Sequence, residues 1–303
     1  MSWWPNTLHD RISSSVVAGS PEWAQDQPVN ATGEEIRLHY GQTGLLERIL
    51  AGLKSLGKDL NRLTHEDLAP ADEFHSQGRA ATRALAALAP IPQASRVLDV
   101  GSGLGGPARY LAAVYRCDVT GLDLTPEFCA VANELSRLAG LADRTRFQAG
   151  DALELPFAES QFDVVWTIQM QMNIQDKRRL YAGIARVLRP GGLFVCQEIC
   201  AGSGEPLDLP VPWASRSEQS HLADPESLRS LVRDAGLRER AWRDITQEII
   251  AARKAQQAGA QTGAFPPLGM HLVLGEQASA KMANSARNAD AGRIVFIQGV
   301  FEK

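Results

Sequence analysis

The sequence predicts an α/β protein whose central sheet is mainly parallel. After about residue 95, short apolar runs alternate with amphipathic segments, and the first apolar run ends directly in a glycine-rich loop. This alternation is typical of strand–helix units, in which helices cover both faces of a parallel sheet. The predicted strands occupy residues 96–100, 118–124, 145–149, 162–168 and 193–199, and the predicted helices residues 107–114, 126–139 and 176–188.

The segments on either side of this pattern set the domain boundaries. Residues 1–33 lack sustained periodicity, which predicts an irregular N-terminal arm. Within residues 34–92, helical apolar spacing runs over 34–63 and again over about 76–88, before the prolines at 90 and 92, which predicts a helical N-terminal layer over the active site. Residues 93–303 form the predicted sheet domain. They include a stretch, 247–292, that is too long for an ordinary loop, and we expect it to be a helical, lid-like insert before a last strand over 293–301.

Charge and cysteine content restrict the partner and the compartment. Lys and Arg total 31 against 35 for Asp and Glu, a balance that disfavours nucleic acid and anionic lipid as partners. No apolar stretch reaches the ~18 residues of a membrane span. Cys196 and Cys200 flank an apolar run, so we interpret them as buried thiols and predict no metal site. The four cysteines form no paired clusters, which predicts a cytoplasmic protein with a small-molecule partner.

The loop after the first predicted strand permits two interpretations. Gly101, Gly103 and Gly106 match the fingerprint G-x-G-x-x-G, in which glycines let the backbone approach a ligand closely. Asp123 ends the next strand, where a carboxylate can accept ribose hydroxyls. Nicotinamide and adenosyl cofactors both carry that ribose, so a nicotinamide-dependent dehydrogenase is a rival interpretation.

Three further features favour S-adenosylmethionine. Asp99 lies inside the first strand, where a dinucleotide-binding strand normally carries an apolar residue, and a carboxylate there suits an ammonium or a sulfonium. Asp151 follows the third strand, where it can accept the adenine amino group. Residues 186–192, RVLRPGG, supply a helix stop and a turn before the fifth strand.

Four segments resemble the class I S-adenosylmethionine-dependent methyltransferases: VLDVGSGLGG (97–106), GLDL (121–124), GDALELPFAESQFDVVW (150–166) and RVLRPGG (186–192). Segments 72–82 and 210–213 are similar to the small-molecule branch with the sarcosine/dimethylglycine N-methyltransferases and the quinone-biosynthesis C-methyltransferases. The resemblance implies a Rossmann-like, doubly wound, seven-stranded sheet with an antiparallel last strand. It also implies S-adenosylmethionine as the cofactor and S-adenosylhomocysteine as its product.

Eight residues are expected at the cofactor, Asp99 from its position in the strand and the others by the resemblance. They are Asp99, Gly101 and Gly103 at the methionine part, Asp123 at the ribose, Leu124, Asp151 and Ala152 at the adenine, and Gln169 at the ammonium.

The acceptor side departs from the family's pattern. Many relatives carry a His pair just after the fourth strand, whereas residues 167–173 read TIQMQMN. A wall of amide and thioether groups suits an amine or sulfur acceptor, whose lone pair attacks after simple deprotonation or without any. The candidate bases elsewhere are His75, Tyr40 and Glu198, with His221 and His271 as further candidates in the less predictable cover. The candidate substrate-pocket residues are Met170, Met172, Trp213, Arg216 and His221.

We therefore expect an enzyme that transfers a methyl group from S-adenosylmethionine to a small metabolite by in-line displacement, at an amine nitrogen. Carbon, oxygen and sulfur acceptors are alternatives. A non-catalytic S-adenosylmethionine-binding partner subunit is a further alternative, because the familiar His is absent after the fourth strand. A homodimer is compatible with the sequence.

Overall fold

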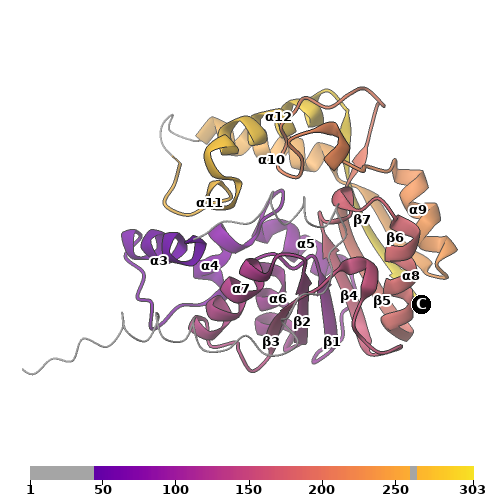
Figure 1. Ribbon diagram of the computed structural model, residues 1–303, viewed down its shortest axis with the longest axis horizontal. Coiled ribbons are helices and arrows are strands. Elements are labelled where there is room, and N and C mark those ends of the chain that lie inside the picture. The colour runs from indigo at the N-terminus through magenta and orange to yellow at the C-terminus, as the bar shows by residue number, and fades with distance from the viewer. Residues whose placement is uncertain (1–43, 260–264) are drawn as a thin grey trace, which may run out of the picture.

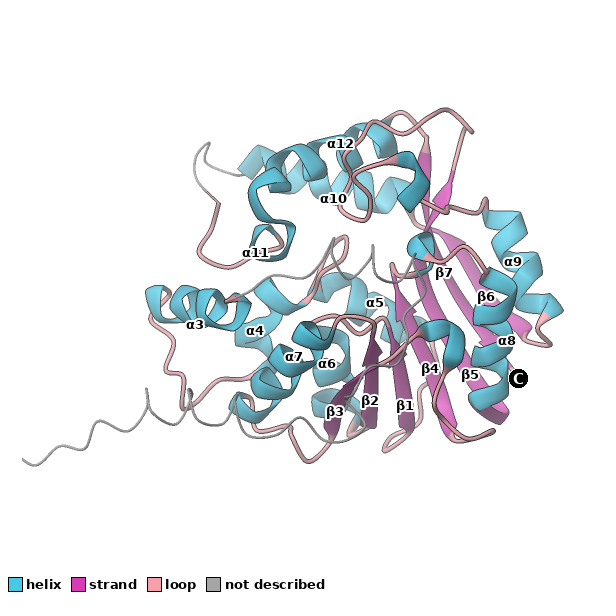
Figure 2. Cartoon of the chain, viewed as in Figure 1, coloured by secondary structure: helices cyan, strands magenta, loops and turns pink. Residues whose placement is uncertain are grey.

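The computed structural model describes residues 44–259 and 265–303. Its centre is a seven-stranded sheet in the order β3-β2-β1-β4-β5-β7-β6 (Figures 1 and 2). The strands are β1 (Arg96–Val100), β2 (Asp118–Asp123), β3 (Thr145–Ala149), β4 (Phe162–Ile168), β5 (Leu188–Ala201), β6 (Arg238–Asp244) and β7 (Ile294–Glu302). The predicted arm at 1–33 and the candidate base Tyr40 lie outside the described residues.

The direction of the strands confirms the predicted sheet. The strands from β3 to β5 pair in parallel, and β7 runs antiparallel to both β5 and β6. β5 is longer than the predicted 193–199, because residues 193–201 pair with β7 and Leu188 also pairs with Phe162 of β4. The carboxyl ends of the parallel strands therefore meet at one edge, which is where ligands bind in open α/β sheets.

Helices cover both faces of the sheet. Successive side chains of a strand point to opposite faces, so neighbouring apolar residues need a packing partner on each face. Val97 packs in one apolar cluster with α5 (Arg79–Leu88), α6 (Gly106–Tyr115) and α7 (Pro126–Leu138). The next residue, Leu98, packs in another cluster with α8 (Lys177–Val187) and α9 (Pro225–Asp234) on the opposite face. The cysteines of β5, Cys196 and Cys200, are buried thiols within this second cluster.

The helical N-terminal layer comprises α3 (Leu45–Ser55), α4 (His65–Asp72) and α5. The sequence analysis did not predict α4, a short helix that begins at a capping box in which Thr64 and Asp67 satisfy each other's backbone amides. α3 and α4 share a cluster with α7 and with Leu104 of the glycine-rich loop. The layer is thus packed directly against the loop.

The predicted insert is helical, with α10 (Thr246–Gly259), α11 (His271–Leu274) and α12 (Ala278–Asp290) between β6 and β7. In Figure 1 these helices lie above the edge at which the parallel strands end. Ile249 and Ala289 from the insert pack with Ile199 of β5 and Phe296 of β7, which anchors the insert to the sheet. Among the described helices, none is long and apolar enough to cross a membrane.

Candidate functional site

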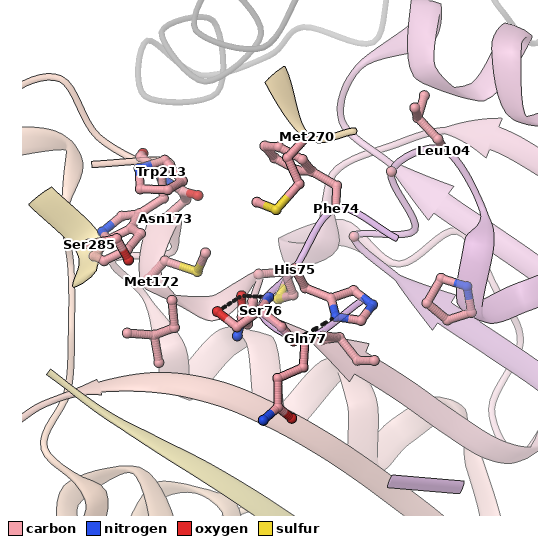
Figure 3. A pocket seen from close by; sticks show the side chains of 18 of the residues that line it. Phe74, His75, Ser76, Gln77, Leu104, Met172, Asn173, Trp213, Met270 and Ser285 are labelled. Carbon is pink, nitrogen blue, oxygen red and sulfur yellow. Dashed lines mark hydrogen bonds between the residues drawn. The ribbon is translucent and has the colours of Figure 1, made fainter. Parts of the chain in front are cut away.

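A cavity of about 920 Å³ lies between the carboxyl ends of the strands and the insert. It is continuous from the glycine-rich loop after β1 to the inner faces of α10 and α12. Figure 3 shows side chains from the N-terminal layer, such as Phe74 and His75, in the same space as Met172, Trp213 and Met270. Residues more than 190 positions apart in the chain therefore enclose a single site.

The glycine-rich loop leaves room where a ligand would approach. Gly101 and Gly103 have φ angles of 74° and 51°, in the left-handed region that favours glycine. A Cβ at Gly101 would lie 2.7 Å from Cβ of Met170, whereas a Cβ at Gly103 would meet no atom within 4 Å. Gly103 thus presents bare backbone to the open part of the cavity.

Asp123 holds this loop in place, a role that the sequence analysis missed. One carboxylate oxygen accepts from the Gly103 amide at 2.8 Å, and the other accepts from the Thr125 amide at 2.9 Å. Burial raises the pKa of Asp123, and the two backbone amides act against that rise. Each carboxylate oxygen accepts more than one hydrogen bond, so the same side chain can orient the loop and receive a ribose hydroxyl.

Asp99 carries a buried carboxyl oxygen that lacks a hydrogen-bond partner among the described residues. Its side chain is 2% exposed, and Oδ2 has no hydrogen-bond partner in the described part of the chain. Burial, and then the charges of Glu73 and Asp123, raise the pKa of Asp99 to about 8. A buried acidic group without a counter-charge is costly, so a cationic ligand at this position would stabilise its ionised form.

Gln169 supplies a second orphaned polar atom. It has a φ of 50°, a strained value for a residue other than glycine, and its Oε1 accepts from the Ser76 amide at 3.0 Å. This leaves Nε2 buried without an acceptor, and Oγ of Ser102 is also buried without a partner among the described residues.

The orphaned groups fit S-adenosylmethionine. Asp99 offers an acceptor for a cation, Gln169 offers a donor for a carboxylate, and Gly103 offers open backbone between them. Leu124, Asp151 and Ala152 line the same cavity, and Oδ1 of Asp151 also accepts from the Leu153 amide at 2.8 Å. All eight residues expected at the cofactor thus line one cavity.

A His–Glu pair lies at the same cavity. His75 is 4% exposed and lines the wall, and its Nε2 lies 2.7 Å from Oε2 of Glu73. Thr82 Oγ1 donates to the same oxygen at 2.7 Å, and Arg79 contacts the other carboxylate oxygen at 2.6 Å. Burial raises the pKa of Glu73, but the hydrogen bond with His75 and the nearby positive charges outweigh it, so the net shift is downward. Glu73 is therefore ionised and orients the imidazole.

The second carboxylate of this segment ties the N-terminal layer to the glycine-rich loop. Asp72 of α4 accepts from Arg109 of α6, whose Nη2 lies 2.8 Å from Oδ2, and both side chains are fully buried. The same guanidinium donates to the backbone carbonyl of Leu104 in the loop and to that of Ala132 in α7. Arg109 thus fixes the position of the loop.

The structure does not bring all the predicted acceptor-side residues to the cavity. Met170, Met172 and Trp213 line it, but Arg216 and His221 do not. Arg216 precedes the short helix η4 (Ser217–Gln219), outside the lining. The His221 amide instead donates to the Met172 carbonyl at 2.7 Å, and the His221 carbonyl accepts from Lys177. His221 therefore lies behind Met172, and Arg216 is exposed outside the cavity.

Glu198, a predicted catalytic residue, is also absent from the lining. It is 1% exposed and accepts from Thr167 Oγ1 at 2.7 Å and from the amides of Met170 and Gln171 at 3.2 and 3.3 Å. Burial raises its pKa to about 7, against the lowering effect of these bonds. Successive side chains of a strand point to opposite faces of the sheet, and the side chain of Glu198 points to the loop after β4. We therefore correct its role to positioning that loop.

Several residues of the site were not singled out from the sequence. Glu73, which contacts His75, and Ser76, which lines the cavity, lie in the segment 72–82 that resembles the family, so their motif was visible although their roles were not. Ile249, Met270 and Met282 come from the insert, where local patterns do not show which helix face meets the sheet edge.

Comparison with known proteins shows similarity to methyltransferases. Residues 98–196 match the family model described as "Methyltransferase domain". A probable tocopherol O-methyltransferase of Oryza sativa subsp. japonica is 37% identical over 46% of this chain and 36% of its own length. The glycine/sarcosine/dimethylglycine N-methyltransferase of Actinopolyspora halophila is 27% identical over 76% of this chain and 39% of its own. This chain thus spans less than half of either relative.

Comparison with solved structures also finds methyltransferases. Geranyl diphosphate C-methyltransferase from Streptomyces coelicolor A3(2), solved with S-adenosyl-L-homocysteine, superposes with a TM-score of 0.67 at 16% identity, covering 91% of this chain and 99% of that one. At this identity the likeness shows the fold alone. Residues 98–196, which contain the glycine-rich loop and Asp123, are thus similar to a methyltransferase domain, and the chain shares the fold of a methyltransferase that was solved with S-adenosyl-L-homocysteine.

Proposed function

We propose that this protein is an enzyme that transfers a methyl group from S-adenosylmethionine to a hydroxyl oxygen of a small molecule. The observation that carries the choice of oxygen is the His75–Glu73 pair in the wall of the cavity that also holds Asp99 and Gln169. The domain match and the tocopherol relative, an O-methyltransferase by name, support the proposal.

The chain's own residues account for binding and orientation. Asp99 and Gln169 would hold the ammonium and carboxylate of the cofactor's methionine part, and Asp123 its ribose. When bound, S-adenosylmethionine supplies a methyl group already activated by the sulfonium. The enclosing walls exclude water and align the acceptor oxygen with that methyl group, which are the main contributions a protein makes to such a displacement.

His75 provides the proton acceptor that a hydroxyl needs. The ionised Glu73 can only accept a hydrogen bond, so Nε2 of His75 donates to it, and Nδ1 is the nitrogen that can take up a proton when the imidazole acts as a base. Nδ1 makes one long, weak contact with the Ser76 carbonyl at 3.4 Å, which an acceptor hydroxyl that enters the cavity would replace. As the oxygen–methyl bond forms and the sulfur–methyl bond breaks, the hydroxyl proton passes to Nδ1 of His75.

An amine nitrogen is the second candidate. The sequence analysis favoured it because no His follows β4, and the amide and thioether groups of Gln169, Met170 and Met172 do line the cavity. A neutral amine attacks without prior loss of a proton, so His75 would be dispensable for it. The relatives include N-, O- and C-methyltransferases by name, and the role of His75 therefore distinguishes the two candidates. A cytoplasmic location and a homodimer stay predictions.

The test combines binding with turnover. S-adenosylhomocysteine should bind saturably by calorimetry, and NADH should not. Transfer of a radiolabelled methyl group should favour phenol and alcohol pools over amine and thiol pools. His75→Asn should lower kcat by about 10²- to 10⁴-fold, the usual contribution of a general base, and leave S-adenosylhomocysteine affinity unchanged.

His271→Asn is the matched control, because His271 lies outside the lining and stacks on Phe265. Full turnover in His75→Asn on the preferred acceptor, or products methylated only at nitrogen, would refute the oxygen assignment. Binding of S-adenosylhomocysteine without turnover on any pool would favour the non-catalytic partner subunit.

A further inference from the structure

We infer that the acceptor is an uncharged molecule with a large apolar body, held in the part of the cavity that the insert encloses. This inference rests on the proposed function and deepens it by naming the acceptor's chemistry. We call this part the acceptor chamber. The insert, the sheet and the loop after β5 contribute to its wall Ile199, Trp213, Ile249, Ile250, Ala252, Arg253, Gln256, Met270, Ser279, Met282, Ala283, Ser285, Ala286, Ala289 and Phe296.

One face of α12 forms a wall of mostly small side chains. The residues of α12 that line the cavity share one side of the helix, and they are Ser279, Met282, Ala283, Ser285, Ala286 and Ala289. Small side chains at five of these six positions keep the helix backbone close to the cavity. This leaves volume for a ligand where a globular core would have larger side chains.

Methionines gather around this space. The chain has five methionines, and every one after Met1 lines the cavity: Met170, Met172, Met270 and Met282. Figure 3 shows the side chains of Met172 and Met270 beside Trp213 and Phe74. Unbranched thioethers adapt to irregular apolar shapes and pack favourably on aromatic rings. Because these methionines come from two distant parts of the chain, only the fold brings them together.

The chamber presents no unpaired charge to an acceptor among the described residues. Its one ionisable lining group there is Arg253 of α10, which is paired with Asp290 of α12 at 2.6 Å. The remaining ionisable lining groups are His75 and the carboxyls of Asp72, Asp99, Asp123 and Asp151, on the cofactor side. A carboxylate or phosphate buried here would lack a counter-charge, which is strongly unfavourable.

The size of the cavity supports a bulky acceptor. Pockets for single drug-sized ligands span roughly 300–1,000 Å³, and this cavity of about 920 Å³ lies near the upper end. The glycine-rich loop, Asp99 and Gln169 account for one end of it, so the chamber remains for a second molecule of considerable size. An amino acid or a simple amine would leave most of its apolar surface uncovered.

The experiment uses the full chain and the neutral fluorophore N-phenyl-1-naphthylamine. We expect saturable fluorescence enhancement at one site per chain. Neutral 2-naphthol should displace the fluorophore at a concentration at least tenfold lower than 2-naphthoate, which has nearly the same shape but carries a charge. Ala286→Asp should weaken binding of the fluorophore at least tenfold. Ala280→Asp, the same change at an exposed position of α12 outside the lining, should leave it unchanged.

Ala286→Leu is the second variant. It narrows the chamber without adding a charge, and it should weaken binding of the fluorophore several-fold. This variant keeps the test available if Ala286→Asp fails to fold. The inference is overturned if the fluorophore does not bind, if the variants at 286 and 280 behave alike, or if 2-naphthoate competes as well as 2-naphthol. S-adenosylhomocysteine affinity, measured on the same samples, should be unaffected by the changes at Ala286. If S-adenosylhomocysteine does not bind the unaltered protein, the proposed function is refuted. Binding of the fluorophore then still tests the acceptor chamber by itself.

Discussion

The buried ion pair between Asp72 and Arg109 gives the sharpest test of how this fold is held together. The perturbation is Asp72→Ala, which removes the carboxylate and leaves the guanidinium of Arg109 in place. Both side chains are 0% exposed, and Arg109 reaches Oδ2 through Nη2 at 2.8 Å and Nε at 3.2 Å. The pair joins α4 of the N-terminal layer to α6, directly below the glycine-rich loop.

The expected loss of stability in Asp72→Ala follows from the burial of both charged side chains. Removing one partner of a buried ion pair typically costs about 3–5 kcal/mol, because the other charge is left uncompensated. Arg109 keeps its bonds to the carbonyls of Leu104 and Ala132, but these are neutral acceptors. An exposed pair is worth only about 0–1 kcal/mol. Arg137 and Glu134, 2.7 Å apart with side-chain exposures of 62% and 29%, form such a pair.

Urea denaturation followed by circular dichroism measures the difference. Asp72→Ala should lower the free energy of unfolding by about 3–5 kcal/mol with an unchanged m-value, and Glu134→Ala by less than about 1 kcal/mol. S-adenosylhomocysteine affinity should also fall in Asp72→Ala, because Arg109 fixes the Leu104 carbonyl of the loop. If the two variants lost the same small amount of stability, the argument from burial would be refuted.

Three further predictions concern the carboxyl groups around the loop. Asp123→Ala should weaken S-adenosylhomocysteine binding by at least tenfold in calorimetry, since it removes the acceptor for the Gly103 amide; unchanged affinity would contradict the role of Asp123. Asp99 has a pKa of about 8 and is mostly protonated at pH 7, so binding of cationic S-adenosylmethionine should release a proton and tighten as pH rises through 8. Calorimetry in buffers of different ionisation enthalpy measures this release, and its persistence in Asp99→Asn would exclude Asp99 as the source. Glu198 has its pKa raised from 4.5 to about 7 in the folded state, so the native protein binds more protons than the unfolded chain. Stability from this group therefore falls as pH rises from about 4.5 to 7. Glu198→Gln should flatten that fall in urea denaturation, and an unaltered pH profile would count against the assignment.

The sequence determined the sheet and the cofactor side of the cavity. Short runs of five to seven residues marked β1, β3 and β4 at the bounds that the structure shows. The inner strands β1 and β4 are largely apolar because both of their faces are buried, whereas β3, at the edge of the sheet, alternates buried and exposed residues at its start. The glycine-rich loop and Asp123 could be placed at one edge for a related reason. Parallel strands all end at the same side of a sheet, so residues that follow strands meet there however far apart they lie in the chain.

The acceptor side depended on tertiary structure. Ser76 and Gln169 are 93 positions apart and bond to each other, and no local pattern predicts that contact. Glu198 was expected at the cavity because it lies near the end of β5, but the alternation of strand side chains turns it toward the loop after β4.

Local pattern thus specified which segments are strands and which loops approach a cofactor, since backbone conformation and burial depend on neighbouring residues. Which faces of α10 and α12 close over the strand ends was decided only by packing between distant segments. The same packing gathered Met170, Met172, Met270 and Met282 around one space. The kind of acceptor that fits is determined by this packing, because the wall of the chamber is formed by side chains from distant segments. No single stretch of sequence shows that these side chains lie together.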